Sequence, residues 1–479
     1  MIAEPLTWCE PAFAGLIGVG RRDITPPAGI YARNWGAALH DVAEGIHMPL
    51  LCTTMTIRAA ASDTPLVLAA IDATWFRGPE GAIQLRDHVC RELGLPAASL
   101  MISLSHTHSG PSISPAEESK PGGDRIRPYV DQVARAIVDS AREALRGECE
   151  CELRFGMGAC TLAADRDLPD PVSKRFVCGF NPSATADHTC LVGRVSRRDT
   201  GVTTATIVNY ACHPTTLGAS NRLISPDYVG SMRAVVESQT SGAPCLFLQG
   251  ASGELAPRTQ YVDDSDVADS HGRQLGFAAV ATLEALLPPG KGLALTGVLE
   301  SGAPLAQWHT RDHAATRAIA STHIAVELPL KASLRSENEI RLTLDACADR
   351  AMKERMHREL LVARTVAGHN GVSTRPVWIW KLGEILLVGQ SDEAYSQFQQ
   401  ELRAAYPRMA VVVMNVVNGW GGYICPAERY QQQIYQSQQS PYASGCLETL
   451  IAKTRGGIDQ MLLRANGSNE SCATGHSTP

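Results

Sequence analysis

Residues 100–111 read Leu-Met-Ile-Ser-Leu-Ser-His-Thr-His-Ser-Gly-Pro. The first five have the length and apolar character of a buried strand, and the polar loop that follows ends in a Gly-Pro turn. A second apolar run, 203–211, is followed by His213 in the same way. Stretches of helical periodicity, such as 79–93 and 129–145, lie between runs of this kind. This alternation predicts an α/β (mixed α+β) fold in which mixed β-sheets are flanked by helices.

The rest of the chain continues the alternation. We expect further strands at 50–59, 66–70, 245–248, 293–299, 377–380, 385–389 and 409–417, and further helices at 229–239, 271–287, 336–367 and 392–405. The segment 286–306 is rich in proline and glycine, which makes it the best candidate for a boundary between two lobes. We predict one catalytic domain over 1–465, made of two lobes, and a flexible polar tail over 466–479.

Composition excludes several classes of protein. The 479 residues are 44% hydrophobic and 19% charged, so the chain can bury a sizeable core and is not intrinsically disordered. The formal net charge is −6, from 43 basic and 49 acidic residues, with no block of Lys or Arg. Nucleic acid is therefore not an expected partner, and we expect a small-molecule substrate instead. The sequence leaves a homo-oligomer open.

The sequence also predicts a cytoplasmic location. Its first 20 residues lack the basic start and continuous apolar core of a signal peptide. No apolar run approaches the roughly 20 residues that span a bilayer, so no membrane span is expected. The 14 cysteines are few for a chain of this length, and many lie in apolar stretches, as expected of free thiols in a reducing compartment.

Common catalytic motifs are missing. The sequence has no HExxH, CxxC, GxSxG or Walker A motif, which argues against the common protease, lipase and NTPase functions. Residues 18–23, Gly-Val-Gly-Arg-Arg-Asp, begin like a dinucleotide-binding fingerprint. However, Asp23 stands in place of the third glycine, and Pro26 and Pro27 follow where a helix should begin. We therefore expect a turn there.

The histidines after the strands carry the clearest chemical signal. Extended chain points residues i and i+2 to the same face, so His106 and His108 could converge on one ion or one substrate. An isolated H-x-H is more often a pair of surface or capping histidines. The second strand-end histidine, His213, favours a common cleft. Imidazoles at neighbouring strand ends suit Zn²⁺, together with a carboxylate and an open position for water, although spacing alone does not identify the other ligands.

A series of motifs, in order along the chain, resembles the catalytic domain of the neutral/alkaline non-lysosomal ceramidase family. The motifs are Gly18-Val-Gly-Arg-Arg-Asp-Ile-Thr-Pro-Pro27, Gly45-Ile-His47, His106-Thr-His-Ser-Gly-Pro111, His213-Pro-Thr-Thr216, Ile224-Ser-Pro-Asp227, Gly250-Ala-Ser-Gly-Glu-Leu-Ala-Pro257, Gly422-Tyr423 and Tyr435. Each motif is weak alone, but the ordered series is fairly specific. The resemblance implies a zinc-dependent amidase that hydrolyses an N-acyl bond.

The resemblance also implies a set of zinc ligands. His106 and His213 match the two zinc histidines, and Tyr423 matches a tyrosine ligand. Glu393 falls where the family has a carboxylate ligand, with Asp392 as a possible substitute because Ser391-Asp392 replaces the usual Pro-Gly. Glu393 could instead cap a helix, and the tyrosine could be an ordinary half-buried residue.

Three further residues match the family's catalytic groups. His108 matches the transition-state histidine, and Tyr435 matches a tyrosine that contacts the substrate carbonyl. Arg166 matches the arginine of an Asn-Arg pair, with Asp165 in place of the asparagine, or is an ordinary salt-bridge residue. Zinc would lower the pKa of a bound water towards about 7, and these three side chains could donate to the developing oxyanion.

The sequence departs from the family at Ala256, where characterised ceramidases carry a serine. Without a hydroxyl, covalent acyl-serine chemistry at this position is excluded. We therefore predict hydrolysis of a smaller, more polar amide, with the adjacent Arg258 as a possible partner for a substrate carboxylate. The alternatives are a ceramidase or N-acyl-lipid amidase, and a non-catalytic metal-binding pseudoenzyme. Asp72 and Asp227 are possible ligands for a second divalent cation, Mg²⁺ or Ca²⁺, but are equally ordinary as turn or cap residues.

Overall fold

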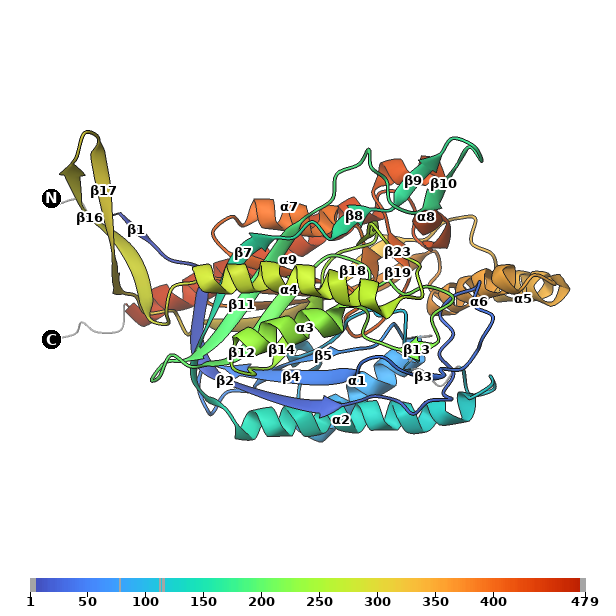
Figure 1. Cartoon of the computed structure of the whole chain (residues 1–479), viewed down its shortest axis with the longest axis horizontal. Coiled ribbons are helices and arrows are strands. Elements are labelled where there is room, and N and C mark those ends of the chain that lie inside the picture. Colours follow the sequence, from blue (N-terminus) through green and yellow to red (C-terminus); the bar gives the residue numbers. More distant parts are fainter. Residues whose placement is uncertain (1–5, 77–78, 112, 114–116, 474–479) are drawn as a thin grey trace.

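Two mixed β-sheets form the centre of the molecule, and helices cover them (Figure 1). The computed structural model describes residues 6–76, 79–111, 113 and 117–473, the last nine for their backbone alone. This arrangement confirms the predicted α/β class with mixed sheets flanked by helices. None of the helices in the described ranges is long and apolar enough to cross a bilayer.

The larger sheet has eight strands and the smaller has four. In spatial order the larger contains β14 (Cys245–Gln249), β12 (Thr203–Tyr210), β11 (Thr189–Arg197), β7 (Cys149–Ala159), β2 (Ala12–Asp23), β4 (Leu51–Arg58), β5 (Leu66–Ile71) and β6 (Leu100–Leu104). The smaller contains β18 (Ile319–Pro329), β19 (Val372–Leu382), β20 (Ile385–Gln390) and β22 (Ala410–Met414). The pairs β14/β12, β5/β6 and β20/β22 are parallel, and the other neighbours are antiparallel.

The two sheets share one apolar core. Phe13, Met55 and Leu68 of the larger sheet belong to the same buried cluster as Trp378 and Trp380 of β19. Burial of side chains of this size contributes about 1.5–3 kcal/mol each, so this layer holds the sheets face to face. Each tryptophan also donates its indole N–H to a backbone carbonyl of the turn just before β6, Trp378 to Ala97 and Trp380 to Ala98.

Helices cover the outer face of each sheet. On the larger sheet these are α1 (Pro79–Leu93), α2 (Ile126–Arg146), α3 (Tyr228–Gln239) and α4 (Ser265–Ala285). On the smaller sheet they are α7 (Gln397–Ala405) and α9 (Cys446–Ala473). Helices α5 (Glu337–Ala346), α6 (Arg350–Thr365) and α8 (Tyr435–Gln439) lie at the end of the molecule that holds β13 (Figure 1).

The glycine motif of residues 18–23 is part of strand β2, not a nucleotide-binding turn. A Cβ at Gly18 would lie 1.9 Å from the carbonyl oxygen of Ala144, and one at Gly20 would lie 2.2 Å from that of Ser140. Both carbonyls belong to α2. The two glycines therefore allow α2 to pack directly on the sheet, which explains this motif by packing.

Further strands, most of them short, complete the structure. They are β1 (Thr7–Trp8), β3 (Gly45–Ile46), β8 (Ala163–Asp165), β9 (Asp167–Asp170), β10 (Arg175–Cys178), β13 (Leu223–Ile224), β15 (Leu255–Pro257), β16 (Lys291–Glu300), β17 (Pro304–Asp312), β21 (Glu393–Ala394) and β23 (Tyr423–Ile424). The segment 286–306, for which we expected a lobe boundary, forms most of the β16–β17 hairpin that projects from the body (Figure 1). Helix α9 extends into the expected tail as far as Ala473, and residues 474–479 lie outside the described residues.

Three predicted elements were wrong in their bounds. The expected helix 336–367 is two helices, because the chain turns at Cys347 and Asp349 caps α6. The expected helix 392–405 begins only at Gln397, because Glu393 is in a strand. The expected strand 409–417 ends at Met414, since Val416 has a positive φ of 54°.

Candidate metal centre

The predicted ligands meet where strands of both sheets end. His106 follows β6, His213 follows β12 and Glu393 follows β20. Each of these strands pairs in parallel with one neighbour, β6 with β5, β12 with β14 and β20 with β22. Asn418 ties the two sheets together along the first half of β6, because its side chain accepts from the Ile102 N–H and donates to the Leu100 carbonyl, both at 2.8 Å.

Three side-chain atoms converge at this point. The Glu393 Oε2 atom lies 2.9 Å from His213 Nε2 and 3.3 Å from His106 Nε2. Two ligand atoms on one tetrahedral Zn²⁺ lie about 3.3–3.5 Å apart, so both distances are close to that span. His108 also belongs here, because His106, His108 and His213 each offer a nitrogen within 4.8 Å of the others. This buried group could hold a metal ion.

Backbone carbonyls fix how two of the imidazoles present their nitrogens. The Nδ1 atom of His106 lies 2.7 Å from the Thr74 carbonyl oxygen, and that of His213 lies 2.6 Å from the Ser252 carbonyl oxygen. A carbonyl only accepts, so each Nδ1 carries the proton and each ring turns its Nε2 atom towards Glu393. Burial, followed by the nearby Arg166 charge, lowers the pKa of His213 to about 3, so this ring is neutral.

Neutral imidazoles in this orientation leave acceptors facing acceptors. The lone pairs of two Nε2 atoms and a carboxylate oxygen would repel one another at these distances. A cation among them converts the repulsion into attraction, as in zinc sites where the other ring nitrogen donates to a carbonyl. The donor set therefore fits a transition-metal ion.

His106 does not reach this site by the predicted route. Its φ is +67°, in the left-handed region, so the H-x-H segment is not extended chain as the prediction assumed. The His106 N–H donates to the Ala73 carbonyl at 2.8 Å, which holds this turn against the loop after β5. The imidazole rings of His106 and His108 are nevertheless adjacent, with centroids 5.0 Å apart. The turn, and not strand alternation, brings them together.

His108 is enclosed by aromatic rings. Its ring centroid lies 5.2 Å from that of Trp35 and 5.1 Å from that of Trp75. Burial, followed by the His106 and His213 neighbours, lowers its pKa well below the ordinary value. Neither ring nitrogen has a hydrogen-bond partner among the described residues. A neutral, buried imidazole with two free nitrogens is ready to bind an ion or a substrate group.

Glu393 and Tyr423 are brought together by a two-strand parallel sheet. They are register partners in β21 and β23, and the Glu393 N–H donates to the Gly422 carbonyl. Trp420 donates its indole N–H to Glu393 Oε1 at 2.6 Å, which leaves Oε2 to the histidines. Glu393 is not a helix cap, because α7 begins four residues later.

Arg166 joins Tyr423 to the histidines. Its Nη2 atom donates to the Gly253 carbonyl at 2.7 Å and to the Tyr423 hydroxyl at 3.2 Å, and lies 3.3 Å from His213 Nε2. Among the described residues Arg166 forms no ion pair with a carboxylate, which disfavours the plain salt-bridge reading. Its guanidinium is almost fully buried. A buried positive charge is thus placed beside the proposed centre.

Tyr435 borders the same group from α8. Its ring centroid lies 5.9 Å from that of Tyr423, and its hydroxyl accepts from Arg358 Nη1 at 3.1 Å. The Arg358 guanidinium also lies over the Trp75 ring, 5.4 Å from the centroid. Arg358 was not among the predicted residues, because nothing distinguishes it within the highly charged α6. Trp420 was not predicted either, although its place three residues before Tyr423 in a glycine-rich run was an available signal.

The alternative carboxylate, Asp392, is engaged elsewhere. Both of its oxygens accept from Arg375, at 3.0 and 2.7 Å.

The two possible ligands for a second cation are also satisfied. Asp72 pairs with Arg233 at 3.0 Å, and Asp227 accepts from the backbone at the start of α3. Neither belongs to the histidine group.

The two expected substrate residues lie apart from the ligands. Arg258 is exposed and donates to the Thr161 carbonyl at 3.1 Å, and no contact among the described residues joins it to the histidines. Ala256 is fully buried in β15, opposite Ala164 of β8. It follows Leu255, whose carbonyl oxygen lies 3.2 Å from His213 Nδ1. Ala256 is therefore next to a residue that orients a proposed ligand.

Comparison with known proteins identifies the fold. No protein-family model matches the sequence, and no protein of curated function matches it. The solved neutral ceramidase from Pseudomonas aeruginosa superposes with a TM-score of 0.67 at 18% identity, over 93% of this chain and 73% of that one. A structure of a ceramidase complexed with C2 gives a TM-score of 0.66 at 17% identity, over 93% and 74%. The chain has a neutral ceramidase-like fold. The resemblance seen in the sequence motifs predicted this ceramidase-like fold, and the prediction is confirmed.

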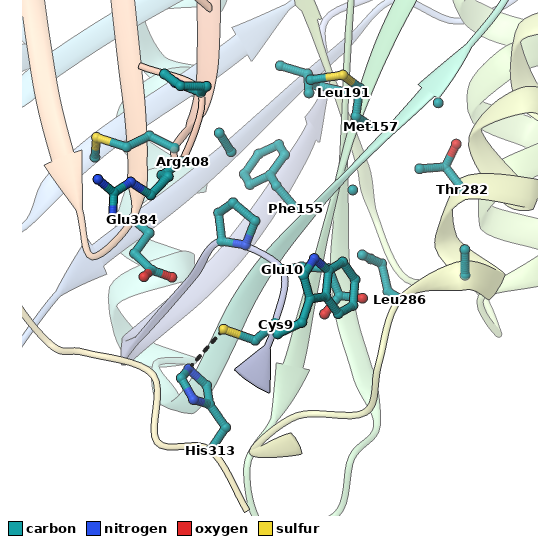
Figure 2. Close-up of a pocket in the computed structure, with 18 of the residues that line it drawn as sticks. Cys9, Glu10, Phe155, Met157, Leu191, Thr282, Leu286, His313, Glu384 and Arg408 are labelled. Carbon is teal, nitrogen blue, oxygen red and sulfur yellow. Dashed lines mark hydrogen bonds between the residues drawn. The ribbon is translucent and has the colours of Figure 1, made fainter. Parts of the chain in front are cut away.

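A separate cavity of about 890 Å³ opens at the other end of β20 from the metal centre (Figure 2). It is bordered by Phe155 and Leu191 of the larger sheet and by Glu384, just before β20. Cys9 lies there with its Sγ atom 3.4 Å from His313 Nε2. None of the proposed metal or catalytic residues of the ceramidase-like fold lines this cavity, so it is distinct from the centre.

Proposed function

We propose that this chain is a zinc-dependent hydrolase that cleaves the amide bond of a small, polar N-acyl substrate. One observation carries the proposal, namely the convergence of two carbonyl-anchored histidines and Glu393 with their acceptor atoms 2.9 and 3.3 Å apart. His106, His213 and Glu393 would hold the ion, with the Tyr423 hydroxyl beside them. A bound ion of this kind polarises a carbonyl and lowers the pKa of a coordinated water.

Other side chains near the proposed ion can act on the substrate carbonyl and exclude water. His108 is neutral and neither ring nitrogen has a partner among the described residues, so its N–H can donate to the carbonyl oxygen as negative charge develops. Arg166 Nη2 and the Tyr435 hydroxyl can donate to the carbonyl oxygen as negative charge develops. The indole rings of Trp35 and Trp75 exclude bulk water around His108, which strengthens these interactions.

The fold favours hydrolysis of an amide, whereas two features of the sequence favour a polar amide over ceramide as the substrate. The ceramidase-like fold supports amide-bond hydrolysis, and the structural neighbours are described as ceramidases. However, Ala256 supplies no hydroxyl for a sphingoid head group, and aromatic residues are only 5% of the chain. The described cysteines are all free thiols, which supports a reducing compartment such as the cytoplasm.

A panel of amides tests the function directly. N-acetylated amino acids and a short-chain ceramide in detergent micelles are incubated with protein after chelation, and again after zinc is restored. We expect zinc-dependent release of acetate from the polar amides, and none from a His106→Ala variant. Zinc binding without hydrolysis of any amide would identify a pseudoenzyme, and preferential cleavage of ceramide would overturn the substrate assignment.

Replacing Tyr435 with phenylalanine is expected to lower kcat about 100-fold while the metal content stays the same. The variant keeps the ring that packs near Tyr423 but loses one donor to the oxyanion, and one such donor is worth about 10²–10³ in rate. Steady-state kinetics and metal analysis of the same sample check both parts. Tyr430→Phe is the matched control, because its hydroxyl contacts Ser440 outside the centre. An equal loss in both variants would contradict the assigned role.

A further inference from the structure

A second cavity begins at Tyr435 and opens to the surface. Its volume is about 520 Å³, within the range of small-molecule sites. One side is formed by β10 and the residue before it, and the other by α6, α8 and the glutamines that precede α8. Tyr435 lines this cavity, and its ring centroid is 5.9 Å from that of Tyr423. The cavity is therefore separated from the proposed metal centre by one aromatic side chain.

The β9–β10 hairpin connects the outer end of this cavity to the centre. Arg166 immediately precedes β9, and Cys178 at the end of β10 is the register partner of Asp167. The hairpin then extends outward to Lys174 and Arg175 at its tip. A substrate lying along β10 would thus have one end near Arg166 and Tyr435 and the other near the tip.

Charge is unevenly distributed along this path. The cavity lining includes three cations, Lys174, Arg175 and Arg355, and no carboxylate. Arg355 contacts the neutral amide of Gln438. Asp170 pairs with Arg175 across the hairpin, but its carboxylate accepts from the Ser173 hydroxyl and does not line the cavity.

The inner end adds one buried guanidinium that forms no ion pair among the described residues. It belongs to Arg166 on the hairpin side, whereas Arg358 on the α6 side pairs with Glu354 at 3.5 Å. The whole chain has a formal net charge of −6, so a cavity with cations and no carboxylate does not follow from average composition. A cleft lined by one sign of charge attracts ligands of the opposite sign and raises their local concentration.

We propose that the substrate carries a carboxylate, which the outer part of this cavity binds through Arg175 and Arg355. This inference rests on the proposed amide hydrolysis. Guanidinium groups bind carboxylates through paired N–H donors, whereas a ceramide would present no anion to them. With the amide near Tyr435 and the carboxylate bound by the side chains of Arg175 and Arg355, the substrate class is an acidic amide in which several bonds separate the two groups, such as an N-acyl amino acid with a side-chain carboxylate. The cations that serve this role are thus different from Arg258.

The test compares the N-acetyl derivative of an amino acid that has a side-chain carboxylate with its side-chain methyl ester, in which the ester removes that negative charge. For the wild type, kcat/KM is expected to be at least about tenfold higher for the free acid, since charge-assisted hydrogen bonds are stronger than neutral ones. In the double variant Arg175→Gln/Arg355→Gln, KM for the acid should rise about tenfold or more, and the preference over the ester should disappear. Arg198→Gln, an exposed arginine just past the end of β11, is the control.

Binding separates this inference from the proposed function. Calorimetry on chelated, metal-free protein measures the same acid and ester without turnover. Acid-selective binding that the double variant loses would support the inference even if no amide is hydrolysed. Equal rates and equal binding for acid and ester would overturn it while leaving amide hydrolysis intact. Selectivity that survives in the double variant but is lost in Arg258→Gln would also overturn it.

Discussion

Replacing Glu393 with glutamine is expected to abolish stoichiometric zinc binding and, with it, amide hydrolysis, while the protein stays folded. The carboxylate oxygen lies 2.9 and 3.3 Å from two histidine nitrogens and supplies the negative charge nearest to them. Loss of an outer partner of a metal ligand typically lowers affinity 10–100-fold, so loss of a direct ligand should cost more than about 100-fold. The glutamine amide N–H can donate to the Nε2 atoms, which satisfies them without an ion.

The adjacent residue supplies the matched control for this variant. Asp392→Asn changes a buried carboxylate in the same way, but Asp392 is bound by Arg375 and not by the histidines. We expect Asp392→Asn to retain the metal and to lose thermal stability, the reverse of Glu393→Gln. Titration with zinc and thermal denaturation of both proteins measure the difference. Retention of zinc by Glu393→Gln, or its loss from Asp392→Asn alone, would mean that the ligand is misassigned.

Replacing Arg375 with methionine is expected to lower the free energy of unfolding by about 3–5 kcal/mol, because it leaves the buried Asp392 carboxylate unpaired. Arg375 also donates to the Ser391 hydroxyl at 2.7 Å, so it holds the residues that lead into Glu393. We therefore expect lower zinc affinity as well. Denaturant unfolding followed by circular dichroism measures the stability change.

The pH dependence of this variant tests the cause of the loss. Burial already raises the pKa of Asp392, and removal of Arg375 takes away its largest opposing influence. The folded variant then holds a proton that the unfolded chain releases near its ordinary pKa of about 3.9. Its stability deficit should therefore be smaller near pH 4 than at pH 7. A double variant with Asp392→Leu should recover much of the loss at pH 7, and a deficit independent of pH would contradict the ion-pair explanation.

The sequence predicted the fold class and the strand-end position of the histidines for reasons that the structure bears out. Apolar runs before His106 and His213 indicated strands, and β6 and β12 end just before these residues. Their convergence required knowledge that the larger sheet brings the ends of β12 and β6, which lie towards its opposite edges, to one point, and no local pattern contains this. The assumed extended geometry at His106 failed, because its left-handed backbone depends on the hydrogen bond to Ala73.

Long-range contacts account for most of what the sequence did not reveal. Glu393 and Tyr423 are 30 positions apart (423 − 393 = 30) and meet through a two-strand sheet too short to leave a periodic signal. Arg358 reaches the centre only because α6 packs over it, and its sequence neighbourhood resembles an exposed helix. The resemblance of ordered motifs supplied residues that spacing could not, whereas the cations around the cavity at Tyr435 became visible only in three dimensions.

The metal content of the purified protein tests the central claim most directly. The protein is prepared without chelators, reconstituted with zinc and freed of excess ion, and its metal is measured by mass spectrometry beside His106→Ala. The convergence of His106, His213 and Glu393 predicts about one zinc ion per wild-type chain and almost none in the variant. A wild-type protein that holds no stoichiometric transition metal after reconstitution would contradict this account.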